Sequence, residues 1–214
     1  MDTDIFSEAK DRAAKLGVRN VLVATNTGES VETAQHIMGP NFSFFAVGNP
    51  SSSQEKGWVL HCGITPETRT RLESEGITVV EQDLSIFQSS PEKGGDQTSF
   101  HSANTAYVGR FGGSFDENDA VPNNICRVMR HILGEFFGDG LCVCVEIALM
   151  AADSGKLPLD EDCVAISTPG GYPLTAIVVH PVKSADLFST HFRIKDVLFV
   201  PGEKDMWFND GPIP

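Results

Sequence analysis

A hydroxyl-rich turn between a strand and a helix is the segment of this sequence best suited to bind a ligand. Residues 25–30 (TNTGES) follow an aliphatic run and precede a helical pattern. Backbone N–H groups at a helix start, the positive end of the helix dipole and the turn's hydroxyls can converge on a phosphate. The same residue types also cap ordinary turns, and Glu29 disfavours a highly charged anion. The candidate phosphate-binding residues are Thr25, Asn26, Thr27, Gly28 and Ser30.

A second turn with adjacent glycines follows a later strand, at residues 168–172 (TPGGY). Gly170 and Gly171 would let a ligand approach the backbone closely, and Tyr172 offers a ring for stacking. An ordinary hairpin connection accounts for the same residues equally well. Gly170 and Gly171 complete the set of candidate binding residues.

One acidic residue, Glu146, interrupts the apolar segment 141–152. Twelve residues is long for a strand, so we predict a helix hidden on nearly all sides, with Asp139 as its N-cap. Glu146 shares a face with Asp153, and Cys142 lies one turn before it. A carboxylate in such surroundings must be paired or have a raised pKa, as many active-site acids do, although a structural role is more common. We expect Glu146 to be buried and hydrogen-bonded.

Several other kinds of site are not indicated. No Walker motif and no Gly-x-Gly-x-x-Gly follows a strand, which disfavours an NTPase or a standard dinucleotide site. His180 and His191 lack the serine or cysteine pattern of a hydrolase triad. Cysteines lie mostly within apolar runs, and Cys142 and Cys144 lack the spacing of a zinc site, so we expect no metal.

Charge and hydropathy restrict the partners. The chain contains 16 Lys and Arg residues and 29 Asp and Glu residues, which gives a net charge of −13 at pH 7. Such a chain repels nucleic acid and anionic lipid. No apolar run approaches the roughly 20 residues that span a bilayer, and residues 1–10 do not have the layout of a signal peptide. We expect a soluble, cytoplasmic protein without a nucleic-acid or membrane partner.

Periodicity and turn residues predict the elements that position the two turns. We expect helices at 6–16, 29–38, 66–75, 122–137 and 141–152, and strands at 18–25, 42–47, 77–81, 163–167, 175–180 and 197–200. Their alternation favours a three-layer αβα fold of the α/β class, with a mostly parallel sheet and a β-rich C-terminal end. One domain would then span residues 1–214.

Two further segments of the domain have a distinct composition. Residues 88–118 contain five glycines and no sustained periodicity, so we expect a loop excursion that serves as a binding loop or has no fixed structure. The helix at 122–137 should pack through one apolar face. That face would carry Ile125, Met129, Ile132 and Phe136.

A long string resembles a known family. Residues 140–158 (GLCVCVEIALMAADSGKLP), followed by CVAIST, TAIVVHP and DVLFVP, resemble small stand-alone proteins related to the C-terminal domain of pyruvate kinase. The match extends to residues 6–16, 20–30 and 64–82 and covers most of the chain. The resemblance implies that fold, and it implies a phosphate at residues 25–30, where pyruvate kinase holds its sugar-bisphosphate effector. The kinase active site lies in other domains, so phosphoryl transfer is not implied.

Three functions fit these observations. The first is a non-catalytic module that binds a phosphorylated small molecule, either a sugar phosphate or flavin mononucleotide, with which the family is loosely associated. The second is a flavin-dependent enzyme that uses Glu146 or the 88–118 loop, and the third is a structural assembly unit. We favour the first and leave open whether a reaction is catalysed. We also expect a homo-oligomer, because the β-rich end with Trp207 and Phe208 would otherwise leave an unprotected edge.

Overall fold

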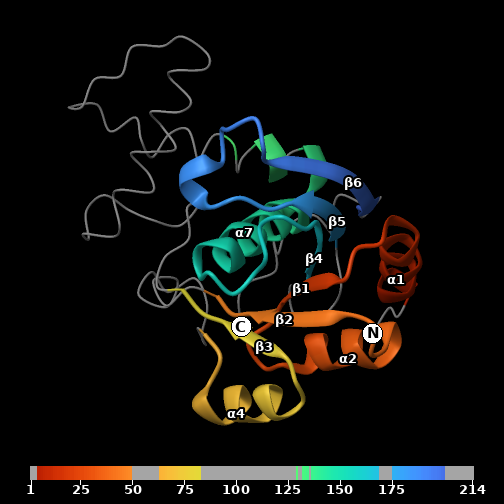
Figure 1. Cartoon of the computed structure of the whole chain (residues 1–214), viewed down its shortest axis with the longest axis vertical. Helices are drawn as coiled ribbons and strands as arrows, with labels where there is room; N and C mark the ends of the chain where they lie inside the picture. Colours follow the sequence, from red (N-terminus) through yellow and green to blue (C-terminus); the bar gives the residue numbers. More distant parts are fainter. Residues whose placement is uncertain are drawn as a thin grey trace, which may run out of the picture.

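Six strands form one mixed sheet, in the order β3-β2-β1-β4-β5-β6. The computed structural model describes residues 4–49, 63–82, 129, 132–134, 136–168 and 175–200, and every structural statement below concerns these residues. Helices cover both faces of the sheet (Figure 1), so the chain belongs to the α/β class. The strands are β1 (Asn20–Ala24), β2 (Ser43–Val47), β3 (Thr78–Val80), β4 (Cys163–Ser167), β5 (Thr175–His180) and β6 (Arg193–Phe199).

The sheet has a parallel half and an antiparallel half. β1 pairs in parallel with β2 and β4, and β2 pairs in parallel with β3. β5 is antiparallel to both β4 and β6. Only residues 168–174 connect β4 to β5, whereas a parallel crossover needs about a dozen residues or more. The expectation of a mostly parallel sheet is therefore wrong at the C-terminal end.

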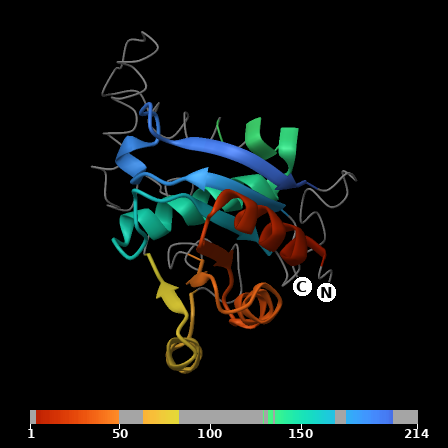
Figure 2. The same ribbon diagram turned by 45° about the vertical axis from the view of Figure 1, so that its right-hand side comes forward.

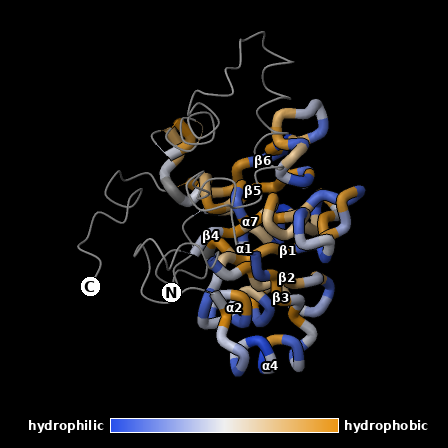
Figure 3. Tube along the Cα trace, turned by 90° about the vertical axis from the view of Figure 1, so that its left-hand side faces the viewer, coloured by the Kyte–Doolittle hydropathy of each residue, from blue (hydrophilic) through white to orange (hydrophobic). Residues whose placement is uncertain are grey.

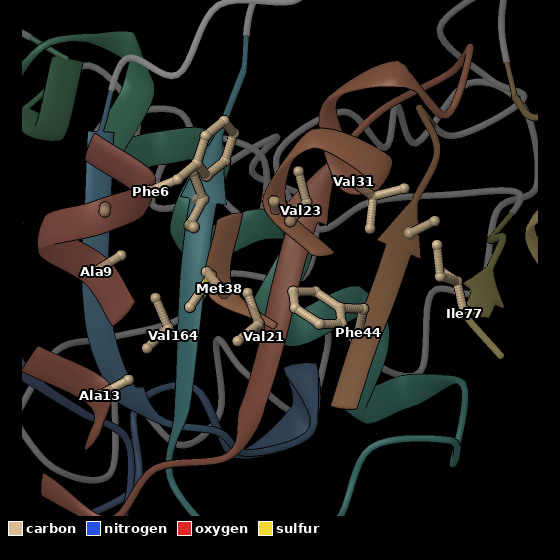
Figure 4. Close-up of a cluster of buried hydrophobic side chains, with 14 of the residues drawn as sticks. Phe6, Ala9, Ala13, Val21, Val23, Val31, Met38, Phe44, Ile77 and Val164 are labelled. Carbon is tan, nitrogen blue, oxygen red and sulfur yellow. The ribbon is translucent and has the colours of Figure 1, made fainter. Parts of the chain in front are cut away.

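Helices α1 (Asp4–Leu16), α2 (Glu29–Met38) and α4 (Pro66–Ser74) share one face of the sheet. Figure 4 shows the side chains of α1 and the strands that meet in this half of the core, where Phe6, Ala9 and Ala13 are fully buried. The two alanines let α1 lie close to the strands, and α1 extends over β5 and β6 (Figure 2). α4 is mostly hydrophilic (Figure 3) and buries only Leu72.

Helix α7 (Asp139–Asp153) covers the opposite face. Successive residues of β1 serve the two halves of the core, because side chains alternate along a strand: Val21 and Val23 pack on the α1 side and Leu22 on the α7 side. α7 is buried on nearly all sides, as its sequence predicts. None of the helices in the described ranges combines the length and apolarity needed to cross a bilayer.

Glycine and threonine define the helix ends at the predicted positions. α2 begins after Gly28, which has a φ of 90°, and ends before Gly39, whose N–H donates to the carbonyl of Gln35. Thr65 caps α4 by accepting a hydrogen bond of 3.2 Å from the N–H of Thr68. α2 therefore has the predicted bounds, and α4 the predicted start.

The described residues just before α7 are helical, but they use only part of the predicted apolar face. Met129 and Leu133 pack against the α7 half of the core, whereas Ile132 and Phe136 are exposed. Residues spaced by four lie on one side of a helix, so the packed side is rotated from the predicted one. Ile125 lies outside the described residues, as does the expected excursion at 88–118.

Candidate ligand-binding site

The turn at residues 25–30 lies where the strand order of the sheet changes direction, because the chain continues from β1 to β2 on one side and from β4 to β5 on the other. β1 continues into α2 on one face, and β4 is reached from α7 on the other. In open α/β sheets ligands bind at such a switch point, outside the carboxyl ends of the strands. We call this end of the sheet, where β1 to β4 finish and β5 begins, the carboxyl edge.

The hydroxyls of the turn hold its own backbone. Thr25 Oγ1 accepts a hydrogen bond of 3.0 Å from the N–H of Gly28, and Thr27 Oγ1 accepts a longer one of 3.4 Å from the N–H of Glu29. Asn26 Oδ1 accepts a bond of 2.9 Å from the N–H of Asn49, just after β2. The predicted residues are thus together at the start of α2, where a phosphate would compete with the threonine oxygens for these N–H groups.

A cation from α4 lies against the same turn. Arg71 Nη2 donates a hydrogen bond of 2.7 Å to the carbonyl of Thr27, and its Nη1 is paired with Glu32 in the first turn of α2. A Cβ at Gly28 would lie 2.9 Å from Arg71 Nη2, so glycine leaves room for the guanidinium. Nothing in the local sequence indicated Arg71, because this contact joins residues far apart in the chain.

The end of β4 completes the opposite side of the site. Thr168 Oγ1 donates a hydrogen bond to the carbonyl of Ala24 at the end of β1. Ser167 is the register partner of Thr175, and all three hydroxyl residues are buried. Sequence reasoning did not single out Ser167 or Thr175, although they flank the predicted glycine turn, and it gave Thr168, the first residue of that turn, no role of its own. Gly170, Gly171 and Tyr172 lie outside the described residues.

The acids of α7 do not form a buried catalytic group. Glu146 is half-buried rather than buried, because with Val143 and Asp153 it lies on the one stripe of the helix that is not fully covered. Asp153 accepts hydrogen bonds from the N–H of Ser184 at 2.9 Å and from its hydroxyl at 2.5 Å, and so caps the short helix η3 (Ser184–Asp186). The expectation of a buried Glu146 is wrong.

The cysteines of the α7 half of the core do not form a reactive group. Burial raises the pKa of the Cys144 thiol to about 12, and burial also raises the pKa of the Cys163 thiol. A thiol with a raised pKa is a poor nucleophile at neutral pH. Among the described residues, no group of three or more His, Cys, Asp or Glu could hold a metal ion.

A charged cluster lies at the opposite end of the sheet, away from the carboxyl edge. Asp162 is 2.9 Å from His180 Nδ1 and 2.6 Å from Lys195 Nζ. Burial opposes ionisation of Asp162, but the hydrogen bonds from Lys195 and His180 outweigh it and lower the pKa of this carboxyl. His180 thus has a carboxylate partner, and its described hydrogen bonds involve no serine or cysteine.

The carboxyl edge therefore combines two helix starts, one guanidinium and several hydroxyls. α2 and α7 both begin there, and each begins after a glycine, Gly28 or Gly138, that has no side chain to cap the helix. The sequence matches no model of a known protein family. Support for a function thus comes from the site itself.

Proposed function

We propose that this protein binds a phosphorylated small molecule at the carboxyl edge, with the phosphate at residues 25–30. The observation that carries the proposal is the position of Arg71, which joins a fixed positive charge to a helix start at the switch point of the sheet. Guanidinium groups and helix N-termini are both common phosphate ligands. Glu32 offsets part of this charge, which favours a ligand with one phosphate over one with several.

The turn can accept a phosphate by exchanging hydrogen bonds. The N–H groups of Gly28 and Glu29 would turn from the threonine oxygens to the phosphate oxygens. The hydroxyls of Thr25 and Thr27, released as acceptors, can donate to the same phosphate. Ser30 is buried in the first turn of α2, directly beside these groups.

Flavin mononucleotide and a sugar phosphate both fit the phosphate end of the site. The described residues offer the cradle at 25–30, and the buried hydroxyls at the end of β4 could meet the polar part of either ligand. When bound, flavin mononucleotide would supply redox chemistry. Glu146 is seven residues into α7, about 10 Å along the helix axis from its start at the carboxyl edge. We therefore propose a binding module rather than a flavin-dependent enzyme.

The fold family, the partners and the assembly of this module are also proposals. The resemblance of residues 140–158 supports a fold like that of the pyruvate kinase C-terminal domain, and the charge of −13 disfavours nucleic acid and anionic membranes as partners. A second role, as an assembly unit, is favoured by apolar side chains on β6: Ile194 and Val197 are exposed. A homo-oligomer that pairs through this end of the sheet would cover them.

Matched ligand pairs test the phosphate requirement. Flavin mononucleotide is titrated against riboflavin by flavin fluorescence, and ribose 5-phosphate against ribose by calorimetry. We expect at least one phosphorylated ligand to bind, and its unphosphorylated partner to bind at least about tenfold more weakly, as expected for hydrogen bonds to a charged group. Equal binding within both pairs, or no binding of either phosphorylated ligand, would contradict the proposal.

Two arginine variants localise the site. Arg71→Met should weaken the phosphorylated ligand about tenfold. Arg69→Met is the control, since Arg69 is also on α4, is similarly exposed and also pairs with a glutamate, Glu81, but does not contact the turn. If both variants bind as the wild type does, the phosphate does not lie at residues 25–30.

A further inference from the structure

The first turn of α7 packs unusually closely on the sheet, and Gly140 allows it. A Cβ added at Gly140 would collide with Thr175 Oγ1, and would lie 2.8 Å from Thr175 Cβ and 2.9 Å from Ser167 Oγ. Two hydroxyls, from the last residue of β4 and the first residue of β5, are therefore directed at the start of this helix. Both side chains are fully buried.

One of these hydroxyls has no partner. Thr175 Oγ1 is buried without a hydrogen bond, the one such side-chain atom among the described residues. Ser167 differs, because its hydroxyl donates a long bond of 3.5 Å to the carbonyl of Thr175. A buried hydroxyl without a partner costs free energy, and such groups in native proteins usually have a function or bind a water or ligand.

The helix start supplies further donors at the same place. α7 has 15 residues and begins after Gly138, which has no side chain to cap the N-terminal N–H groups. The first N–H groups of a helix and the positive end of its dipole favour an acceptor oxygen with negative charge. The N–H of Leu141 donates to the carbonyl of Gly138 at 3.2 Å, so the helix start would meet an oxygen atom through the N–H groups before Leu141, beside the hydroxyl of Thr175.

We infer that the first turn of α7, at Gly140, and the hydroxyl of Thr175 form a second subsite for an acidic oxygen of the ligand. This inference rests on the proposed function only in placing the ligand at the carboxyl edge. The subsite lies at the same end of the sheet as the phosphate turn, since Thr168 follows Ser167 and its hydroxyl bonds to the carbonyl of Ala24, which precedes Thr25. α2 and α7 would then hold one ligand from opposite faces of the sheet. The oxygen belongs to a phosphoryl or a carboxylate group.

Two substitutions at one position isolate the hydroxyl. Thr175→Ser keeps the hydroxyl and removes the methyl group, whereas Thr175→Ala removes both. Thermal unfolding of each variant is followed while sodium phosphate or sodium acetate is added at constant ionic strength with sodium chloride, because a ligand that binds the folded state raises the unfolding midpoint. The phosphate and acetate curves show which group the subsite takes.

We expect Thr175→Ala to bind at least one of these anions about tenfold more weakly than Thr175→Ser does. Without either anion, Thr175→Ala should be at least as stable as Thr175→Ser, since an unpaired hydroxyl contributes nothing to stability. Equal affinities of the two variants would overturn the inference, as would a Thr175→Ala protein that is already much less stable without anion. Arg71→Met separates the two claims: if phosphate binding depends on Arg71 but not on Thr175, only the second subsite fails.

Discussion

The hydroxyl of Thr168 donates a hydrogen bond to the carbonyl oxygen of Ala24, and so joins the end of β4 to the end of β1. These are the two strands between which the sheet changes its direction of winding. Backbone pairing between β1 and β4 ends at Val23 and Ile166. The Thr168 side chain therefore joins the two strands beyond their last backbone pair. The bond fixes the two sides of the candidate site relative to each other.

Loss of this bond should be measurable as a loss of stability. Thr168→Val leaves the carbonyl of Ala24 without this donor, and we expect the free energy of unfolding to fall by about 1–3 kcal/mol. Thr168→Ser keeps the hydroxyl and should lose less than about 1 kcal/mol. Urea unfolding of both variants is the measurement. Equal stabilities of the valine and serine variants would show that the bond does not stabilise the fold.

The sign of the stability change in Gly140→Ala tests how closely α7 packs on the sheet. Alanine is a better helix former than glycine by about 1 kcal/mol, so an unconstrained helix would be stabilised by Gly140→Ala. Here the added Cβ would meet Thr175 and Ser167, and overpacking costs about 1–3 kcal/mol or more. We expect a net loss of stability in urea unfolding, partly relieved when Thr175→Ala is added. A more stable Gly140→Ala protein would mean that α7 does not pack this closely on β4 and β5.

The contacts of Asp162 predict a pH dependence of stability. Its pKa is lowered in the folded protein, so its contribution is present above the ordinary aspartate value of about 3.9 and is lost as the pH falls through the lowered value. Asp162→Asn should cost about 1 kcal/mol at pH 7, a small value because the partners are partly exposed to solvent.

Urea midpoints of the wild type and the Asp162→Asn protein, compared from pH 7 to acid, test this dependence. The gap between the two proteins should close as the pH falls below the ordinary value. Asp160→Asn is the control at an exposed position and should change little at any pH. A gap that widens in acid would contradict the account of this cluster.

The apolar side chains on β6 predict self-association. Ile194 and Val197 are 37% and 40% exposed, and an edge strand with such residues is a common pairing surface. Light scattering at tens of micromolar protein should show at least a dimer. Val197→Lys should shift the protein toward monomer, whereas Leu159→Lys, at a similarly exposed apolar residue elsewhere, should not. A monomeric wild-type protein under these conditions would rule out this assembly.

Much of the fold follows from local sequence signals. The bounds of α2 between Gly28 and Gly39 agree with the prediction, since each glycine has a positive φ that favours glycine. β4 and β5 also have their predicted bounds. The antiparallel pairing of β5 was not predicted, although the connection at 168–174 is too short for a crossover between parallel strands.

The wrong predictions concern features that depend on tertiary packing. Glu146 is half-buried because α7 leaves one stripe uncovered, and the sequence of an almost wholly apolar helix does not show which stripe that is. Leu133, rather than Ile132, packs on the core for the same reason. Of the candidate site, the turn at 25–30 was predictable from its composition, whereas Arg71 comes from another helix and the close packing at Gly140 depends on the sheet register.

The most direct measurement of the central claim is the amide spectrum of ¹⁵N-labelled protein during titration with sodium phosphate, at constant ionic strength maintained with sodium chloride. The claim predicts saturable shifts of the Gly28, Glu29 and Ser30 amides, because the phosphate would take over the N–H groups that now bond to Thr25 and Thr27. The same shifts should weaken in the Arg71→Met protein and persist in Arg69→Met. Turn amides that do not move, while the protein remains folded, would contradict phosphate binding at the start of α2.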